Sequence, residues 1–160
     1  MNEIKIKGKN YFGKYDHIRE ACRAVILDGD NILLSHETKH DVWMLPGGGK
    51  EIDETDEECV IREVSEETGY IFRPSEFTLQ IGEYYEDNKF ISKYFIGTII
   101  GTTETDLTEA EIAGGLEARW LPIKEALDIF SNYNDHTYFE EKRGLYQREY
   151  SALKEILKGI

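Results

Sequence analysis

The stretch Gly48–Tyr70, GGKEIDETDEECVIREVSEETGY, carries the strongest signals in the sequence for both structure and chemistry. Thr55 is a good N-cap for a helix, and Glu58, three residues later, completes a capping box with it. Gly69 is the glycine expected just after the last helical residue. Together these signals predict a helix from about Asp56 to Thr68.

The predicted helix has two separate faces when its residues are spaced at about 100° each. One is an apolar stripe that can face a core, formed by Val60, Ile61 and Val64. The other carries three glutamates at i, i+3 and i+4, namely Glu63, Glu66 and Glu67. Neighbouring carboxylates repel one another, and a bound Mg²⁺ would remove that penalty because it prefers oxygen ligands. An exposed acidic face without a metal is the alternative, and helix spacing alone does not decide between the two.

Composition limits the classes of protein to which the chain can belong. It has 160 residues, of which 40% are apolar, so we expect a single domain over residues 1–160. The net charge of −13 disfavours binding to nucleic acid or to an anionic membrane surface. The sequence has no apolar run near the ~20 residues that cross a bilayer and no signal-peptide pattern at its start. The two cysteines have no metal-ligand spacing, so a cytoplasmic protein is expected.

Several further elements can be predicted around this helix. Apolar and β-branched runs predict strands at 22–27, 32–34, 77–85, 89–100 and 117–121. The segment 28–31 is typical of a hairpin turn, and 46–49 predicts a tight loop after the apolar run 42–45. Pro122 fits the first turn of a short helix that extends to Phe130. A second helix is predicted near the C-terminus around 145–157, with Lys142, Arg143 and Arg148 on a solvated face.

The arrangement of the fixed residues in 48–70 resembles the Nudix box, the signature of the Nudix (MutT-like) hydrolases. The matching pattern is Gly48, five residues, Glu54, seven residues, and then REVSEETGY over 62–70. Only Tyr70 departs from it, because an aliphatic residue is usual there. The preceding WMLPGGG at 43–49 and the later EARWLP at 117–122 also look like the family, so the resemblance covers roughly residues 20–157.

The resemblance implies an α/β fold, an α/β/α sandwich around a mixed β-sheet with the Nudix box as loop–helix–loop. It also implies hydrolysis of a nucleoside diphosphate linked to another moiety, with Mg²⁺ (or Mn²⁺) as cofactor. Carried over to this sequence, the metal ligands would be Glu63, Glu66, Glu67 and the Gly48 carbonyl. Arg62 would orient the carboxylates, and Glu54 would be a supporting position.

The general base that activates water stays open at this point. Glu67 and Glu63 are candidates within the box, and a glutamate before the late strand is another. There we select Glu111 and Glu109 as auxiliary candidates, although exposed loop charges are the more ordinary interpretation of either one.

Residues that would recognise the substrate are less clearly marked. Tyr84 and Tyr94 lie on the two predicted central strands, where a nucleobase could stack, and Arg23 could touch a phosphate. For any single tyrosine, packing in the sheet is the more ordinary role. We expect a small-molecule nucleotide substrate, most simply a nucleoside triphosphate such as an oxidised dNTP, or ADP-ribose or a nucleotide sugar. The chain would act as a monomer or homodimer.

Two alternatives to an active hydrolase remain. The first is a catalytically silent module of the same fold that binds a nucleotide, which the intact set of charged box residues argues against. The second is an unrelated acidic calcium-binding protein, but the twelve-residue calcium-loop pattern is absent from the sequence.

Overall fold

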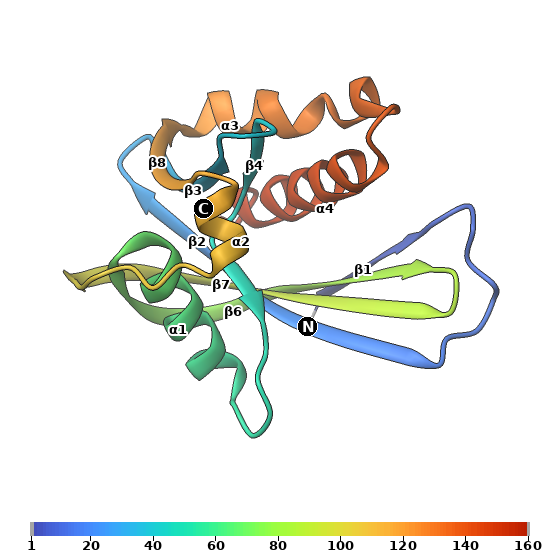
Figure 1. Ribbon diagram of the computed structural model, residues 1–160, viewed down its shortest axis with the longest axis horizontal. Coiled ribbons are helices and arrows are strands. Elements are labelled where there is room, and N and C mark those ends of the chain that lie inside the picture. Colours follow the sequence, from blue (N-terminus) through green and yellow to red (C-terminus); the bar gives the residue numbers. More distant parts are fainter. Residues whose placement is uncertain (1, 160) are drawn as a thin grey trace.

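The computed structural model describes residues 2–159 and is built on a mixed β-sheet with helices on both faces (Figure 1). Its strands are β1 (Asn2–Lys7), β2 (His17–Asp28), β3 (Asn31–Glu37), β4 (Val42–Met44), β5 (Gly47–Gly49), β6 (Tyr70–Tyr85), β7 (Asn88–Thr102) and β8 (Leu116–Pro122). Its α-helices are α1 (Asp56–Thr68), α2 (Glu109–Ala113), α3 (Ile123–Ser131) and α4 (Glu140–Leu157), with a 3₁₀ turn at Tyr133–His136.

The sheet mixes parallel and antiparallel pairs, as the fold expected from the resemblance requires. The strand order is β1-β6-β7-β2-β3-β4, with β5 paired to β2 and β8 paired to β3. The β1–β6 and β2–β7 pairs are parallel, whereas the other pairs are antiparallel. In Figure 1, α1 lies on one side of the sheet and α3 and α4 lie on the other. The α/β/α sandwich predicted from the resemblance is therefore confirmed.

Two hydrophobic clusters hold these layers together. The larger one joins the sheet to α3 and α4 through side chains such as Leu34, Ile81, Phe130 and Leu153. The smaller one joins the sheet to α1 and includes Cys22, Cys59 and Val64. Both cysteines are free and buried, so they act as small core residues.

Helix α1 begins and ends where the sequence predicts. The Thr55 hydroxyl accepts the Glu58 backbone N–H, the Glu58 side chain accepts the Thr55 N–H, and Gly69 adopts the left-handed conformation at φ 75°. Its buried stripe differs from the predicted one, because Ile61 is 36% exposed. Cys59 is buried instead, beside Val60 and Val64.

Other predicted elements needed correction. Residues Gly47–Gly49 form β5 rather than a loop, because their backbone pairs with β2 at Ala21–Arg23. Strand β6 begins at Tyr70 and not near Phe77, since the ladder accommodates Pro74 at an irregularity between Pro74 and Glu76. Helix α3 starts at Ile123, one residue after Pro122. Strand β1 and helix α2 were not predicted.

The basic residues of α4 were also misjudged in part. Arg143 is partly exposed and pairs with Glu140, whereas Lys142 and Arg148 are buried. Arg148 pairs with Glu149 and Glu83, so it belongs to a buried ionic network and not to a solvated face.

In the part of the chain that the structure describes, no helix combines the length and the apolar character needed to cross a bilayer.

Candidate active site

Arg62 is the centre of the charged cluster on α1. Its guanidinium donates two hydrogen bonds to Glu54, from Nε to Oε2 at 2.6 Å and from Nη2 to Oε1 at 3.0 Å. Nη1 donates to Glu63 Oε1 at 3.0 Å and to Glu66 Oε2 at 3.2 Å, while Nη2 also donates to the Gly49 carbonyl at 3.0 Å. One side chain therefore fixes three carboxylates and the backbone of β5.

These contacts shift the ionisation of both partners of the Arg62–Glu54 pair. The Arg62 hydrogen bonds lower the pKa of Glu54 to about 2, so this carboxylate is ionised at neutral pH. In return, the hydrogen bond to Glu54 raises the pKa of Arg62 above its usual range. Arg62 thus stays a cation that can orient the neighbouring carboxylates.

Glu67 is buried between α1 and the sheet, with only 7% of its surface exposed. Its Oε2 atom accepts the Ser35 hydroxyl at 3.1 Å and the Gly47 N–H at 3.3 Å. Burial, followed by the charge of Glu63, raises the pKa of Glu67 to about 8. The expectation that all three glutamates lie on a face separate from the core is therefore wrong for Glu67.

Glu63 lies against β5. A Cβ atom placed on Gly48 would come within 2.5 Å of Glu63 Oε2, so a side chain at this position would displace the carboxylate. Burial raises the pKa of Glu63, and the hydrogen bond from Arg62 offsets part of that effect. A glycine at residue 48 is thus required for the carboxylate to reach the strand.

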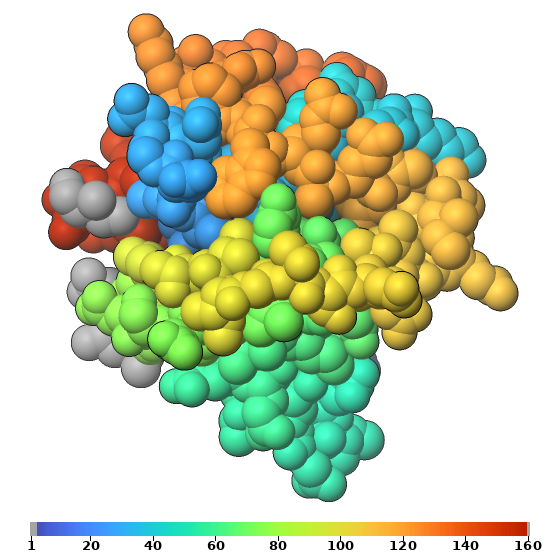
Figure 2. Space-filling model, turned by 90° about the vertical axis from the view of Figure 1, so that its left-hand side faces the viewer, coloured from blue at the N-terminus to red at the C-terminus, as the bar shows by residue number. Residues whose placement is uncertain are grey.

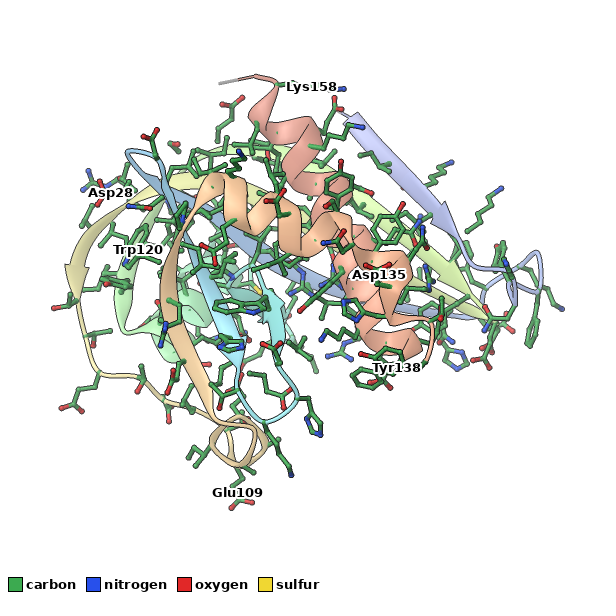
Figure 3. The ribbon with its side chains drawn as sticks, turned by 90° about the horizontal axis from the view of Figure 1, so that it is seen from above. Asp28, Glu109, Trp120, Asp135, Tyr138 and Lys158 are labelled. Carbon is green, nitrogen blue, oxygen red and sulfur yellow. The ribbon has the colours of Figure 1, made fainter. Side chains whose placement is uncertain are left out.

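The segment after β7 brings one further glutamate toward this cluster. Asp106 N–H donates to the Glu66 carbonyl at 2.8 Å, so residues 103–108 run alongside α1 (Figure 2). The charge of Glu111 contributes to the raised pKa values of Glu63 and Glu67, so Glu111 lies near both. Its Oε1 accepts the Thr108 N–H at 2.9 Å. Glu109 is exposed and points away from the body of the molecule (Figure 3).

The donor set is suited to a hard divalent cation. The group comprises Glu63, Glu66, Glu67 and the Gly48 carbonyl, and all of its donors are oxygens. Within residues 2–159, no three His, Cys, Asp or Glu side chains are already arranged around a common metal position. Instead, Arg62 holds Glu63 and Glu66, and Glu67 remains buried with little compensating charge. A cation beside Glu63 and Glu67 would supply that compensation, so these residues fit a metal.

The expected aromatic platform for a nucleobase is not formed by the two predicted tyrosines. Tyr94 is 0% exposed, and its hydroxyl donates to the buried Glu149 at 2.7 Å, so its ring has no face free for stacking. Tyr84 is buried against Tyr11 and Tyr15. It lies on the opposite sheet face from its neighbour Glu83, which contacts Arg148 of α4.

Arg23, the third predicted substrate residue, lies next to β5 on the same sheet face as Tyr94. Ser35 was not singled out from the sequence, although it contacts Glu67 directly. A lone serine in an apolar strand carries no motif, and only the pairing of β3 with its neighbours places it beside α1.

Comparisons with known proteins identify the family. The family model described as "NUDIX domain" matches residues 17–143. The chain is 40% identical over 67 residues to "Putative nudix hydrolase 1" of Caenorhabditis elegans, which covers 38% of this chain and 18% of that protein. It is 28% identical over 115 residues to "Diphosphoinositol polyphosphate phosphohydrolase 3-alpha" of Mus musculus, covering 71% of this chain and 68% of the relative.

The fold is also similar to solved structures. The chain superimposes on a NUDIX hydrolase from Nitrosomonas europaea with a TM-score of 0.65 and 20% identity, covering 88% of this chain and 89% of the other. The sequence match to the Caenorhabditis elegans protein spans less than a fifth of that protein's length, so it concerns one segment of a much longer relative.

Proposed function

Because the chain belongs to the NUDIX domain family, we propose that it is a Mg²⁺-dependent (or Mn²⁺-dependent) hydrolase of a nucleoside diphosphate linked to another moiety. The observation that carries the proposal is the convergence on Arg62 of Glu54, Glu63 and Glu66, with Glu67 beside them. We further propose that residues 1–160 act as a single domain, as a monomer or homodimer.

Each charged residue has a role in this proposal. Glu63, Glu66, Glu67 and the Gly48 carbonyl would hold the metal. When bound, Mg²⁺ would neutralise pyrophosphate oxygens and lower the pKa of a coordinated water. Arg62 orients Glu63 and Glu66 while Glu54 anchors its guanidinium, so Arg62 and Glu54 position the ligands.

A carboxylate must accept the proton of the attacking water as the P–O bond of the anhydride breaks. We propose Glu67, Glu63 or Glu111 for this step, because each lies within the cluster of mutually repelling carboxylates. We no longer propose Glu109, since it is exposed and points outward.

The substrate is proposed to be a small nucleotide, either a nucleoside triphosphate such as an oxidised dNTP, or ADP-ribose or a nucleotide sugar. The name of the mouse relative adds diphosphoinositol polyphosphates to the substrates worth testing. Arg23 remains a proposed contact for a phosphate. Tyr84 and Tyr94 are no longer proposed as stacking residues, because the ring of Tyr84 packs against Tyr11 and Tyr15 and that of Tyr94 is fully buried in the core.

A hydrolysis panel with and without Mg²⁺ tests this proposal. It would contain nucleoside triphosphates, 8-oxo-dGTP, ADP-ribose, nucleotide sugars, dinucleoside polyphosphates and a diphosphoinositol polyphosphate. We expect turnover that needs the metal, is lost in Glu66→Gln, and is kept in Glu57→Gln, a control at an exposed glutamate of the same helix. Nucleotide binding without turnover of any substrate would support the alternative, a catalytically silent nucleotide-binding module.

A further inference from the structure

Strand β5 separates two oppositely charged groups. A Cβ placed on Gly48 would lie 2.5 Å from Glu63 Oε2, on the side of the carboxylate cluster. A Cβ on Gly47 would lie 2.9 Å from Arg23 Cγ, and one on Gly49 would lie 3.7 Å from Arg19 Nη2. The absence of side chains at Gly48 and Gly47 thus lets Glu63 approach one side of β5 and Arg23 approach the other, while Arg19 lies at ordinary contact distance from Gly49.

Arg23 is a buried cation that lies near enough to Glu149 for its charge to help lower the pKa of that carboxyl. Only 7% of its surface is exposed, and its Nε atom donates to Ser92 Oγ at 3.5 Å. Among the described residues it has no carboxylate partner within 4.0 Å. Glu149 is shared, because it also accepts hydrogen bonds from Arg148, Tyr94 and the Leu45 N–H. A buried guanidinium that has no direct carboxylate partner favours an incoming anion.

Arg19 lies four residues before Arg23 on β2, so both side chains emerge on the same face of the sheet. The Arg19 side chain is exposed, and among residues 2–159 no carboxylate oxygen lies within 4.0 Å of its guanidinium nitrogens. Its Cζ atom lies 5.4 Å from the centroid of the Phe90 ring, and Arg148 Cζ lies 6.0 Å from the same ring. Phe90 is therefore flanked by two guanidinium groups. Glu83 and Glu149 balance the charge of Arg148, whereas Arg19 has no such carboxylate partner among the described residues.

We propose that Arg19 and Arg23 bind a phosphate of the substrate that lies beyond the cleaved anhydride bond. This inference rests on the proposed hydrolase function and narrows its substrate class. A substrate whose diphosphate is held beside Glu63 would extend across β5 toward the two arginines. Nucleoside triphosphates and other polyphosphates carry a phosphate for this site, whereas nucleotide sugars place an uncharged hydroxyl-rich group there. The chain accordingly prefers a polyphosphate substrate to a nucleotide sugar.

Kinetics with two substrates test the proposal in Arg19→Gln, whose exposed position makes folding insensitive to the change. A charge-assisted hydrogen bond to a phosphate corresponds to about a tenfold or greater change in affinity. We expect the KM for a nucleoside triphosphate to rise by about that factor, while the KM for UDP-glucose and both kcat values stay within about twofold. Arg73→Gln, at an exposed arginine on the opposite end of β6 from Glu83, should change neither KM.

Arg23→Lys gives a second test, because it keeps the charge but loses the planar fork of donors. It should raise the KM for the triphosphate alone, in protein shown by its melting temperature to be folded. Equal changes in the two KM values, or no change for the triphosphate in either variant, would overturn the proposal.

A binding measurement separates failure of this inference from failure of the proposed function. Titration of inorganic triphosphate into metal-free protein requires no turnover. We expect wild type to bind it about tenfold or more tightly than Arg19→Gln. Equal binding would reject the phosphate site even if the chain is a hydrolase. Tighter binding by wild type, with no hydrolysis of any substrate, would keep the site and reject the catalytic function.

Discussion

Replacing Glu67 by glutamine should stabilise the metal-free protein at neutral pH while abolishing its activity. The pKa of Glu67 is raised from 4.5 to about 8, because the side chain is buried and lies near Glu63. A carboxyl with a raised folded-state pKa contributes stability below its unfolded pKa, and that contribution is lost as the pH rises toward the folded pKa. Wild type should therefore lose stability between pH 4.5 and about 8 through this group.

The size of the effect follows from linkage. One pKa unit corresponds to about 1.4 kcal/mol, so the full shift amounts to roughly 5 kcal/mol as an upper limit. Between pH 5 and pH 7 the expected change is roughly 2 to 3 kcal/mol. Glutamine cannot ionise, and its carbonyl oxygen can accept the Ser35 hydroxyl and the Gly47 N–H, which both point to Oε2 in wild type.

The assay is urea unfolding in EDTA, followed by fluorescence of Trp43 and Trp120, at several values between pH 5 and pH 8. The free energy of unfolding of Glu67→Gln relative to that of wild type should increase as the pH rises across this range. That of Glu57→Gln should change with pH as the wild-type value does. Saturating Mg²⁺ should raise the stability of wild type at pH 8 by about 3 kcal/mol at a hundred times its Kd, and that of the variant by less. A difference between variant and wild type that does not grow with pH would refute the reasoning about Glu67.

Three further predictions address the ligands, the core and the buried network. Glu66→Gln should lower metal-dependent kcat by about a hundredfold or more while leaving the melting temperature unchanged, because this side chain is partly exposed and is a proposed ligand; wild-type rates would remove it from the site. Val64→Asp should destabilise the protein by about 3 kcal/mol or more, and Ile61→Asp by much less, because only Val64 is fully buried; equal melting temperatures would contradict this orientation of α1. Glu149→Gln should cost about 3 kcal/mol in urea unfolding, because it leaves Arg148 with a weaker partner. The pKa of Glu149 is held below its usual value despite burial, by Arg148 above all, so its contribution in wild type should persist above pH 4.5 and disappear as the pH falls through the lowered folded pKa.

The parts of the fold that could be predicted are those whose signals are local. Helix α1 was predicted at its exact bounds because Thr55, Glu58 and Gly69 act within a few residues of the ends that they cap. The hairpin of β2 and β3 was identified from a turn of four residues, Asp28–Asn31. The Nudix box was identified for the same reason, since its fixed residues are contiguous.

The elements that escaped prediction depend on distant partners. Strand β1 pairs in parallel with β6, which places Ile4 opposite Ile81. These two residues are separated in the sequence by almost half of the chain, so no local pattern reveals the pairing. The three glycines of β5 have no strand propensity and form a strand only because Ala21–Arg23 of β2 supplies their hydrogen-bonding partners. Likewise, Arg148 looks like a solvated helix residue until Glu83 and Glu149 are placed beside it.

The burial of Glu67 bears most directly on the choice between a metal site and an exposed acidic helix face. An acidic face that merely solvates a helix would keep its carboxylates in water, where their repulsion costs only a few tenths of a kcal/mol. Glu67 instead lies at the interface of α1 with β3 and β5, where an apolar residue would pack without any penalty from a buried charge. A sequence that retains a carboxylate in such a position sacrifices stability there, and strongly perturbed carboxyl groups of this kind are typical of functional sites. The same burial that makes Glu67 destabilising in the metal-free protein is therefore an argument that a cation belongs beside it.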